Sequence, residues 1–505
     1  MKMKLKNKTV KKLVGKYKDI SILDNIGAIL GWDLNVNLPP MAAVGRGEQA
    51  AFVTNLINKA FLDKEFRKLL ESANDKKDLL PEEAAIVRNL NRASDYFTKV
   101  PTEIIQEKSK ATAEAYVAWD GAKKADKFAD FSPHLEKLVE IDLIVAEHLG
   151  YRQTPLDALL DLHEPCLTSE FCIKNIVSLQ APLTKLVRRV QKSKKYLEGA
   201  EFIDGQKLYP VDLQKKLSQF IAKKMGYRLD SGRIDVSSHP FTTTLGREDV
   251  RITTFYKDHD FRDSFSSTMH ETGHALYEQN IDQAFDKTPL EYGVSFGIHE
   301  ALSRFWENQI GRSTSFLKFM TPIFLAFYPD AGSKTNEDTF INLFNLVRPS
   351  LIRIEADELT YTLHIIVRFE LEQELFAKKL KVRDLPEAWR ARMKKYLGVV
   401  PKTDREGVLQ DVHWSGGSFG YFPAYALGNL YASQFLAKIK KEINIDRDLE
   451  KGHLGGVLYW LNENVHKHGS LYWPQELVKI ATGEALNSKY FLEYLESKYS
   501  KIYSV

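Results

Sequence analysis

The sequence has few cysteines, no long apolar run and no strong excess of charge of either sign. Among 505 residues there are two cysteines, Cys166 and Cys172, and their spacing matches no zinc or redox motif. We therefore expect two free thiols in a reducing compartment rather than a disulfide. No stretch of about 18 apolar residues is present, which excludes a transmembrane helix. The Lys-rich start is not followed by an apolar segment of signal-peptide length. We therefore expect a cytoplasmic protein that binds no membrane.

The balance of positive and negative charge argues against nucleic acid as a partner. The 71 Lys and Arg residues stand against 67 Asp and Glu residues, which gives a net charge of +4. No dense basic patch is interleaved with aromatic residues, so we expect no nucleic-acid binding. The length would allow two or three domains, but no internal repeat, low-complexity tract or Pro/Gly/Ser-rich linker marks a boundary.

Helical periodicity dominates the chain. Apolar residues recur three and four positions apart in segments 8–30, 46–62, 64–75, 82–98, 102–127, 133–149, 169–197, 211–225, 341–379 and 430–498. A turn-rich stretch is expected at 32–40. Between 226 and 256, Val, Ile and Thr alternate instead, bounded by Gly, Asp and Pro, which predicts one short sheet. The sequence therefore predicts a mainly α protein with a small β-sheet.

One short motif points to a metal. Residues 270–274 read H-E-T-G-H, and two histidines four apart on a helix lie on one face, so both imidazoles can reach one ion. Glu271 can then act as general base on metal-activated water, the arrangement found in zinc peptidases. The alternative is an exposed helical turn without a metal. Apolar and small neighbours favour a buried helix instead, in which histidine and glutamate need partners.

A catalytic zinc site needs a third protein ligand and an open position. Glu300 is the first candidate, because it lies on the next predicted helix, which has a buried face. Glu307 and Glu291 are alternatives that spacing does not exclude. The predicted sheet just before the motif fits either a cleft wall that pairs with an extended peptide or a structural hairpin.

A polar stripe follows within the predicted helix 341–379. Its members recur four, four, three and four residues apart and are Arg353, Asp357, Tyr361, His364 and Arg368. Such a stripe fits a solvated helix face with charge pairs, but its residue types also suit the wall of a cleft.

A glycine-rich segment is the last candidate. Residues 407–429 hold five glycines together with His413 and Tyr421, and glycine lets a backbone approach a ligand closely. His413 and Tyr421 are candidate donors to an oxyanion. The alternative is an aromatic-rich turn packed on the core.

Together these motifs resemble the carboxypeptidase Taq family, thermostable zinc/cobalt metallocarboxypeptidases of bacteria and archaea. The resemblance covers the whole length. The matching residues are Trp32-Asp33 with Pro39-Pro40 and Arg46, Asp235 to Phe241, Asp249 to Thr254, His270 to His274, His299-Glu300 with Ser303-Arg304, Ile352-Arg353 with Ala356 to Glu358, and Gln410 to Gly428. The chain departs at Ala301 and Leu302, where the family commonly has Ser-Gln. We expect this change to affect substrate preference or local packing more than metal binding.

The resemblance implies a fold as well as a chemistry. The expected fold is a large helical groove-type zinc peptidase with one small β-sheet beside the active-site cleft. A single domain over residues 1–505 is expected, with two helical lobes flanking a deep groove. Helices of residues 1–225 would form much of one wall, and the catalytic motifs would lie within 235–430.

The resemblance also implies a set of metal-binding and catalytic roles. It makes His270, His274 and Glu300 the ligands of one divalent metal per chain, with zinc as the first choice and cobalt as the alternative. It makes Glu271 the general base, and it suggests His413 as a transition-state donor.

The remaining implied roles concern the substrate. Arg353 is assigned to the substrate's terminal carboxylate, with Arg251 and Arg348 as competitors. Tyr421 is suggested as a second transition-state donor.

From these roles we predict a metal-dependent carboxypeptidase that releases C-terminal amino acids from peptides, and the resemblance also implies a homodimer. One alternative is a metallo-oligopeptidase that cleaves internal bonds of short peptides with the same metal site. The other is a helical interaction protein whose metal is structural. A structural zinc site is normally closed by four protein ligands, which argues against the last alternative.

Overall fold

The computed structural model describes residues 3–197, 208–329 and 336–505. The chain divides into two compact units, each made of three chain segments. The first comprises Met1–Ser94, Glu201–Phe344 and Ala432–Ala485, and the second comprises Asp95–Ala200, Asn345–Tyr431 and Leu486–Val505. Helices α4 (Pro81–Lys99) and α18 (Phe422–Glu442) contribute residues to both units. Neither unit is a continuous stretch of sequence, so each depends on pairing between distant segments.

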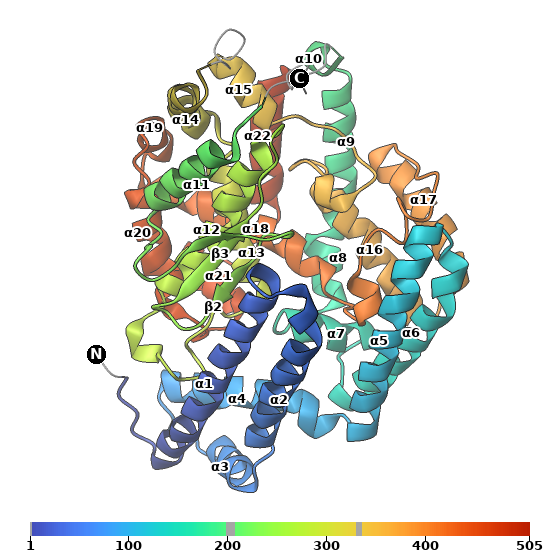
Figure 1. Ribbon diagram of the computed structural model, residues 1–505, viewed down its shortest axis with the longest axis vertical. Coiled ribbons are helices and arrows are strands. Elements are labelled where there is room, and N and C mark those ends of the chain that lie inside the picture. The colour runs from blue at the N-terminus through green and yellow to red at the C-terminus, as the bar shows by residue number, and fades with distance from the viewer. Residues whose placement is uncertain (1–2, 198–207, 330–335) are drawn as a thin grey trace. The chain divides into compact units, whose positions relative to one another are not determined.

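The first unit is helical and holds the three-stranded sheet (Figure 1). Besides parts of α4 and α18, its elements are α1 (Lys8–Val36), α2 (Ala43–Phe61), α3 (Lys64–Asn74), α11 (Val211–Met225), β1 (Ile234–Val236), β2 (Thr242–Thr244), β3 (Val250–Thr254), α12 (Arg262–Gln279), α13 (Phe296–Arg304), α14 (Thr314–Phe327), α15 (Glu337–Phe344), α19 (Ile445–Glu450), α20 (Gly455–Asn464) and α21 (Pro474–Thr482). A π-helical turn, Phe305–Ile310, continues α13.

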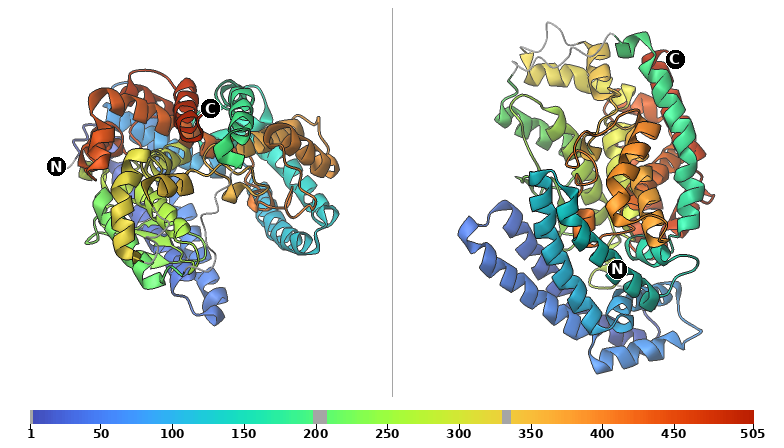
Figure 2. Two further views of the ribbon diagram at one scale, coloured as in Figure 1. Left: turned by 90° about the horizontal axis from the view of Figure 1, so that it is seen from above. Right: turned by 90° about the vertical axis from the view of Figure 1, so that its right-hand side faces the viewer.

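The second unit contains helices without a strand among its described residues. Its elements, besides parts of α4 and α18, are α5 (Thr102–Ala125), α6 (Phe128–Leu149), α7 (Pro155–His163), α8 (Ser169–Asn175), α9 (Gln180–Gln191), α10 (Lys194–Leu197), α16 (Tyr361–Phe376), α17 (Leu385–Leu397) and α22 (Lys489–Tyr503). The long helices α5 and α6 pack side by side (Figure 2). Across the described ranges, no helix has the length and apolarity to cross a membrane. The mainly α fold with one small sheet is therefore confirmed.

The sheet packs against α12, the helix that carries the H-E-T-G-H motif. Its strand order is β1-β3-β2, with β1 parallel and β2 antiparallel to β3. Val250 and Ile252 of β3 are fully buried and pack with Tyr227, Ala222 of α11 and Ala275 of α12. Burying one such aliphatic side chain contributes about 1.5–3 kcal/mol. The central strand is thereby anchored on α12, and β2 lies beside it at the sheet's edge.

Several predicted element boundaries were wrong, and the predicted helical segment 430–498 is divided among α18 to α22. Helix α1 continues to Val36, into the stretch predicted as turn-rich. The predicted helix 169–197 is divided into α8, a 3-10 turn, α9 and α10. Pro182 explains one of these breaks, because proline lacks an N–H and is tolerated in the first turn of a helix but not in its interior.

The predicted helix 341–379 was also wrong. Helix α15 ends at Phe344, and a 3-10 turn, Arg353–Glu355, precedes α16, which begins at Tyr361. Pro349 disfavours helical geometry at the residue before it. Asp357 accepts hydrogen bonds from the backbone N–H groups of Leu359 and Thr360, both at 3.0 Å, and so acts as a cap before α16.

The polar stripe therefore does not lie on one helix, and it is not a solvated face. Arg353 and Asp357 precede α16, whereas Tyr361, His364 and Arg368 lie within it. All five are buried. Buried charges of this kind need partners, and Arg353 and Arg368 find theirs in the glycine-rich segment described below.

Candidate metal centre and substrate-binding residues

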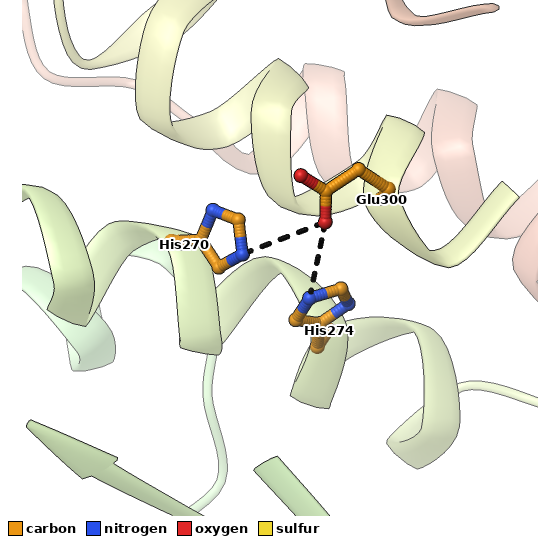
Figure 3. A group of neighbouring side chains, drawn as sticks. All are labelled: His270, His274 and Glu300. Carbon is orange, nitrogen blue, oxygen red and sulfur yellow. Dashed lines mark ion pairs between the residues drawn. The ribbon is translucent and has the colours of Figure 1, made fainter. Parts of the chain in front are cut away.

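Helices α12 and α13 bring three predicted ligands together. His270 and His274 stand on successive turns of α12, and their imidazoles face the carboxylate of Glu300 on α13 (Figure 3). Oxygen Oε2 of Glu300 lies 3.7 Å from His270 Nε2 and 3.9 Å from His274 Nε2. Within the described part of the chain, these residues form a group whose candidate ligand atoms lie within 4.8 Å of one another.

The donor set fits a divalent metal. Two imidazole nitrogens and one carboxylate oxygen are the ligands of catalytic zinc sites, and bonds of about 2.1 Å in tetrahedral geometry place ligand atoms about 3.4 Å apart. The two separations from Glu300 Oε2, 3.7 and 3.9 Å, would need to shorten by only a few tenths of an ångström. Burial holds the pKa of His274 well below its usual value, and the neutral imidazole is the form that binds metal. With three protein ligands, one position is left for water or substrate.

Gly273 allows the two helices to approach this closely. A Cβ atom at this position would lie 2.7 Å from Leu302 O and 2.7 Å from Ser303 Cα, both backbone atoms of α13. The side chains of Ala301 and Leu302, which replace the family's polar pair, are fully buried. This departure from the family pattern therefore lies in the packed part of α13.

Neighbouring charges orient the three candidate ligands. Arg304 Nε donates to Glu300 Oε1 at 2.7 Å, so the other oxygen, Oε2, faces the histidines. Glu307, an alternative ligand from the sequence, instead lies 2.9 Å from His270 Nδ1. Burial opposes ionisation of Glu307, but Arg304, His270 and Arg312 outweigh it and hold its pKa well below the usual value. Glu307 thus supports His270 from the side opposite Nε2. The other alternative, Glu291, is not part of the ligand group found among the described residues.

Glu271 is held by the sheet. Thr242 of β2 donates its hydroxyl to Glu271 Oε2 at 2.6 Å and lies 3.1 Å from the Glu271 carbonyl oxygen. Burial raises the pKa of Glu271, against the opposing effects of His270 and Thr242. A buried carboxylate with a raised pKa is a stronger base than a solvated one. Sequence reasoning missed Thr242, because a run of three threonines in a strand carries no signal for a hydrogen bond to one glutamate.

A second set of predicted residues lies in the second unit. Arg353 donates through Nε to Asp411 Oδ1 at 2.9 Å, and Arg368 donates through Nε to Asp411 Oδ2 at 2.7 Å. Gln410 Oε1 accepts from the Arg353 backbone N–H at 2.8 Å and from Arg368 at 2.7 Å. Tyr361 completes the group, since its hydroxyl accepts from Arg353 at 3.0 Å. Two guanidinium groups thus share one carboxylate.

The two predicted oxyanion donors are near this arginine group. The His413 ring centroid lies 5.3 Å from that of Tyr421 and 6.3 Å from that of Tyr425. The Arg353 guanidinium lies 5.1 Å from the same Tyr425 ring. Burial, together with Arg353, lowers the pKa of His413 to about 4. His413 is therefore neutral near pH 7 and can still donate one N–H.

Of the two competing arginines, Arg348 lies in the second unit and Arg251 in the first. Arg251 of β3 is paired with Asp249 through two hydrogen bonds, at 2.8 and 2.7 Å, and its guanidinium lies 5.6 Å from the Trp32 ring. Its positive charge is therefore matched by one carboxylate. Sequence reasoning assigned no role to Gln410 or Asp411, the partners of Arg353 and Arg368. The available signal was an Asp beside a Gln in a segment rich in His and aromatic residues.

A helical fold that presents H-E-x-x-H on one helix and a glutamate on the next is typical of metallopeptidases. A profile of the carboxypeptidase Taq (M32) metallopeptidase family matches residues 12–499. The chain belongs to this family and is an enzyme of the metallocarboxypeptidase class.

Individual relatives agree with this assignment. Thermostable carboxypeptidase 1 of Pyrococcus furiosus is 40% identical over 495 residues, which cover 98% of this chain and 99% of that protein. Carboxypeptidase 1 of Bacillus subtilis is 39% identical over 491 residues, which cover 96% and 97%. A solved structure of a Pyrococcus furiosus carboxypeptidase has a TM-score of 0.94 at 39% identity and covers 98% of this chain and 99% of its own. The family resemblance seen in the motifs is thus confirmed over nearly the whole chain.

Proposed function

We propose that this enzyme removes amino acids from the C-termini of peptides, with His270, His274 and Glu300 as metal ligands and Glu271 as general base. The observation that carries the proposal is the position of Glu271. Glu271 directly follows the proposed ligand His270 on α12, and the Thr242 hydroxyl donates to Glu271 Oε2 at 2.6 Å. We infer zinc as the native metal, with cobalt as the alternative.

A bound divalent ion supplies Lewis acidity, which makes water acidic enough to lose a proton near pH 7. Glu271 accepts that proton as water attacks the scissile carbonyl, and then delivers it to the leaving amine. Thr242 occupies Glu271 Oε2, so Oε1 is the oxygen available to water. Arg304 holds Glu300 and so keeps one ligand oxygen in a fixed direction.

The terminal carboxylate is assigned to the arginine group of the second unit. Arg353 and Arg368 share the single carboxylate Asp411, which leaves one formal positive charge in a largely buried group. Such a group favours an anion, and a guanidinium can bind a carboxylate through two parallel hydrogen bonds. His413 and Tyr421 are assigned to the oxyanion as donors.

The deciding experiment is digestion of peptides with free and amidated C-termini by the metal-loaded enzyme, read by mass spectrometry over time. We expect single residues to be lost stepwise from free C-termini and amidated peptides to resist. Equal cleavage of both, at internal bonds, would instead establish the oligopeptidase alternative.

The choice between the arginines needs a matched pair of variants. Lysine keeps the charge but loses the bidentate geometry. Losing one charged hydrogen bond costs about 1.5–3 kcal/mol, so Arg353→Lys should lower kcat/KM for free peptides roughly 10- to 100-fold. Arg251→Lys is the control and should leave kcat/KM nearly unchanged. If Arg251→Lys lowers kcat/KM and Arg353→Lys does not, Arg251 rather than Arg353 binds the terminal carboxylate of the substrate.

The remaining proposals concern assembly and location. We propose a homodimer, to be tested by light scattering on the purified protein at several concentrations. We also propose a reducing, cytoplasmic setting, which agrees with the absence of a disulfide at the exposed Cys166 and the buried Cys172.

A further inference from the structure

A chain of three side chains, the buried Glu278 and the partly buried His299 and His274, ends at the proposed metal ligand His274. His274 Nδ1 lies 3.3 Å from His299 Nδ1, and His299 Nε2 lies 2.6 Å from Glu278 Oε1. Glu278 stands one turn beyond His274 on α12, and His299 precedes Glu300 on α13. The three residues therefore join the two helices that carry the ligands.

The geometry allows only one set of proton positions if His274 binds a metal. His274 Nε2 faces Glu300 Oε2 at 3.9 Å, so it must be the unprotonated, ligating nitrogen and Nδ1 must carry the proton. His299 Nδ1 then accepts that proton's hydrogen bond. The proton of His299 must accordingly be on Nε2, where it is donated to Glu278. Each donor in the chain meets an acceptor.

The surroundings keep His299 in this position. A Cβ atom at Gly293 would lie 2.4 Å from His299 Nε2 and 2.6 Å from Tyr277 Cε1, so the loop before α13 packs directly on the ring. Gly293 also donates its backbone N–H to Glu278 Oε1 at 3.0 Å. Tyr277 covers the ring from α12, with centroids 4.9 Å apart.

Glu278 also contributes a negative charge to the group of charged residues around the proposed metal site. Its side chain is 3% exposed, and Oε2 is buried without a hydrogen-bond partner, a costly arrangement for a carboxylate. The charged residues connected around the centre are the carboxylates Glu271, Glu278, Glu300 and Glu307 and the guanidiniums Arg304 and Arg312. Their formal charges leave two negative charges. One divalent cation balances them.

We propose that Glu278 and His299 are positioning residues that act through His274 and set the affinity of the metal centre. Glu278 fixes the tautomer of His299, which in turn fixes the tautomer and ring orientation of His274. A ligating histidine usually donates to a carboxylate or carbonyl directly, and losing that partner costs 10- to 100-fold in metal affinity. Here a second histidine is inserted between the ligand and the carboxylate. The inference rests on the proposed metal site.

The test measures metal affinity rather than activity. The full-length protein is stripped of metal, and zinc and cobalt dissociation constants are measured by competition with a chromophoric chelator. We expect Glu278→Gln and His299→Leu each to weaken binding about 10- to 100-fold. If Glu278 acts through His299, the double variant binds no more weakly than His299→Leu alone.

The control is Glu291→Gln, a substitution of the same type in the loop before α13, where Glu291 accepts from the Lys287 backbone N–H at 2.7 Å. Its affinity should stay within twofold of wild type. The visible spectrum of the cobalt-loaded protein should change in Glu278→Gln and not in Glu291→Gln. If His299→Leu does not fold, His299→Phe replaces it, because the phenyl ring keeps the shape of the side chain but can neither accept from His274 nor donate to Glu278.

Two results would overturn the inference: Glu278→Gln binding within twofold of wild type, or a double variant weakened by the product of the two single effects. His274→Ala separates this failure from failure of the metal site. If His274→Ala binds as wild type does, the proposed ligands are wrong. If only His274→Ala loses metal, the ligands stand and the positioning pair fails.

Discussion

Gly273→Ala tests whether close contact between α12 and α13 makes the metal centre. The new Cβ would lie 2.7 Å from Leu302 O and Ser303 Cα, whereas non-bonded carbon atoms pack best at about 3.5–4.0 Å. Both neighbours are backbone atoms, so no rotamer change relieves the overlap. The helices must separate by roughly 0.8 Å. Glu300 lies on the displaced helix, and metal–ligand distances tolerate only about 0.2 Å.

The energetic cost can be bounded. Overpacking of a core contact typically costs about 1–3 kcal/mol, while alanine is favoured over glycine in a helix by up to about 1 kcal/mol. Gly121→Ala in α5 is the matched control, because a Cβ there meets nothing within 4 Å. We expect Gly121→Ala to stabilise the protein slightly. Gly273→Ala should be less stable than this control by about 1–3 kcal/mol.

The assay is urea denaturation of the metal-free variants, combined with metal affinity by chelator competition. We expect zinc binding to fall at least tenfold in Gly273→Ala and to be unchanged in Gly121→Ala. A Gly273→Ala protein that is as stable as Gly121→Ala and binds zinc normally would refute the reasoning, since it would show that α13 does not need this approach.

Three further predictions follow from the structure. Glu271→Gln should keep its metal by elemental analysis but lose about 10²–10⁴ in kcat, the usual contribution of a general base; near-normal turnover would disprove the role. Burial raises the pKa of Glu372 from 4.5 to about 7, so the folded state keeps a proton that the unfolded state loses as pH rises. The protonated Glu372 therefore contributes up to about 3 kcal/mol to the free energy of unfolding below pH 4.5, and this contribution is lost as the pH rises to about 7. The free energy of unfolding should fall between pH 5 and 8 relative to Glu372→Gln, and parallel curves would contradict this. Adding metal at 100 times its dissociation constant should stabilise the folded protein by about 2.7 kcal/mol, seen as a higher Tm that chelator reverses; His274→Ala should show no such shift.

The helical class, the position of the sheet and the metal motif were predictable because each depends on local spacing. The 3.6-residue period marked helices such as α11, and the alternation of Val, Ile and Thr marked the strands. The error at 341–379 had a local cause that was visible: Pro349 interrupts the pattern, and Asp357 is a cap residue. The burial of Arg353 and Arg368 was not predictable, because their shared partner, Asp411, lies more than 40 residues further along the chain.

The sequence by itself determined that His270 and His274 share a helix face, because a four-residue spacing in an α-helix has that geometry whatever surrounds it. It also determined the family, because several linked motifs stand in the right order. Only the tertiary structure decided which carboxylate meets the histidines, since Glu300 and Glu307 are both close in sequence and only helix packing separates their roles. It also decided why residue 273 is glycine, and it revealed the path from Glu278 through His299 to His274. These contacts join different helices, and contacts between helices depend on packing rather than on local periodicity.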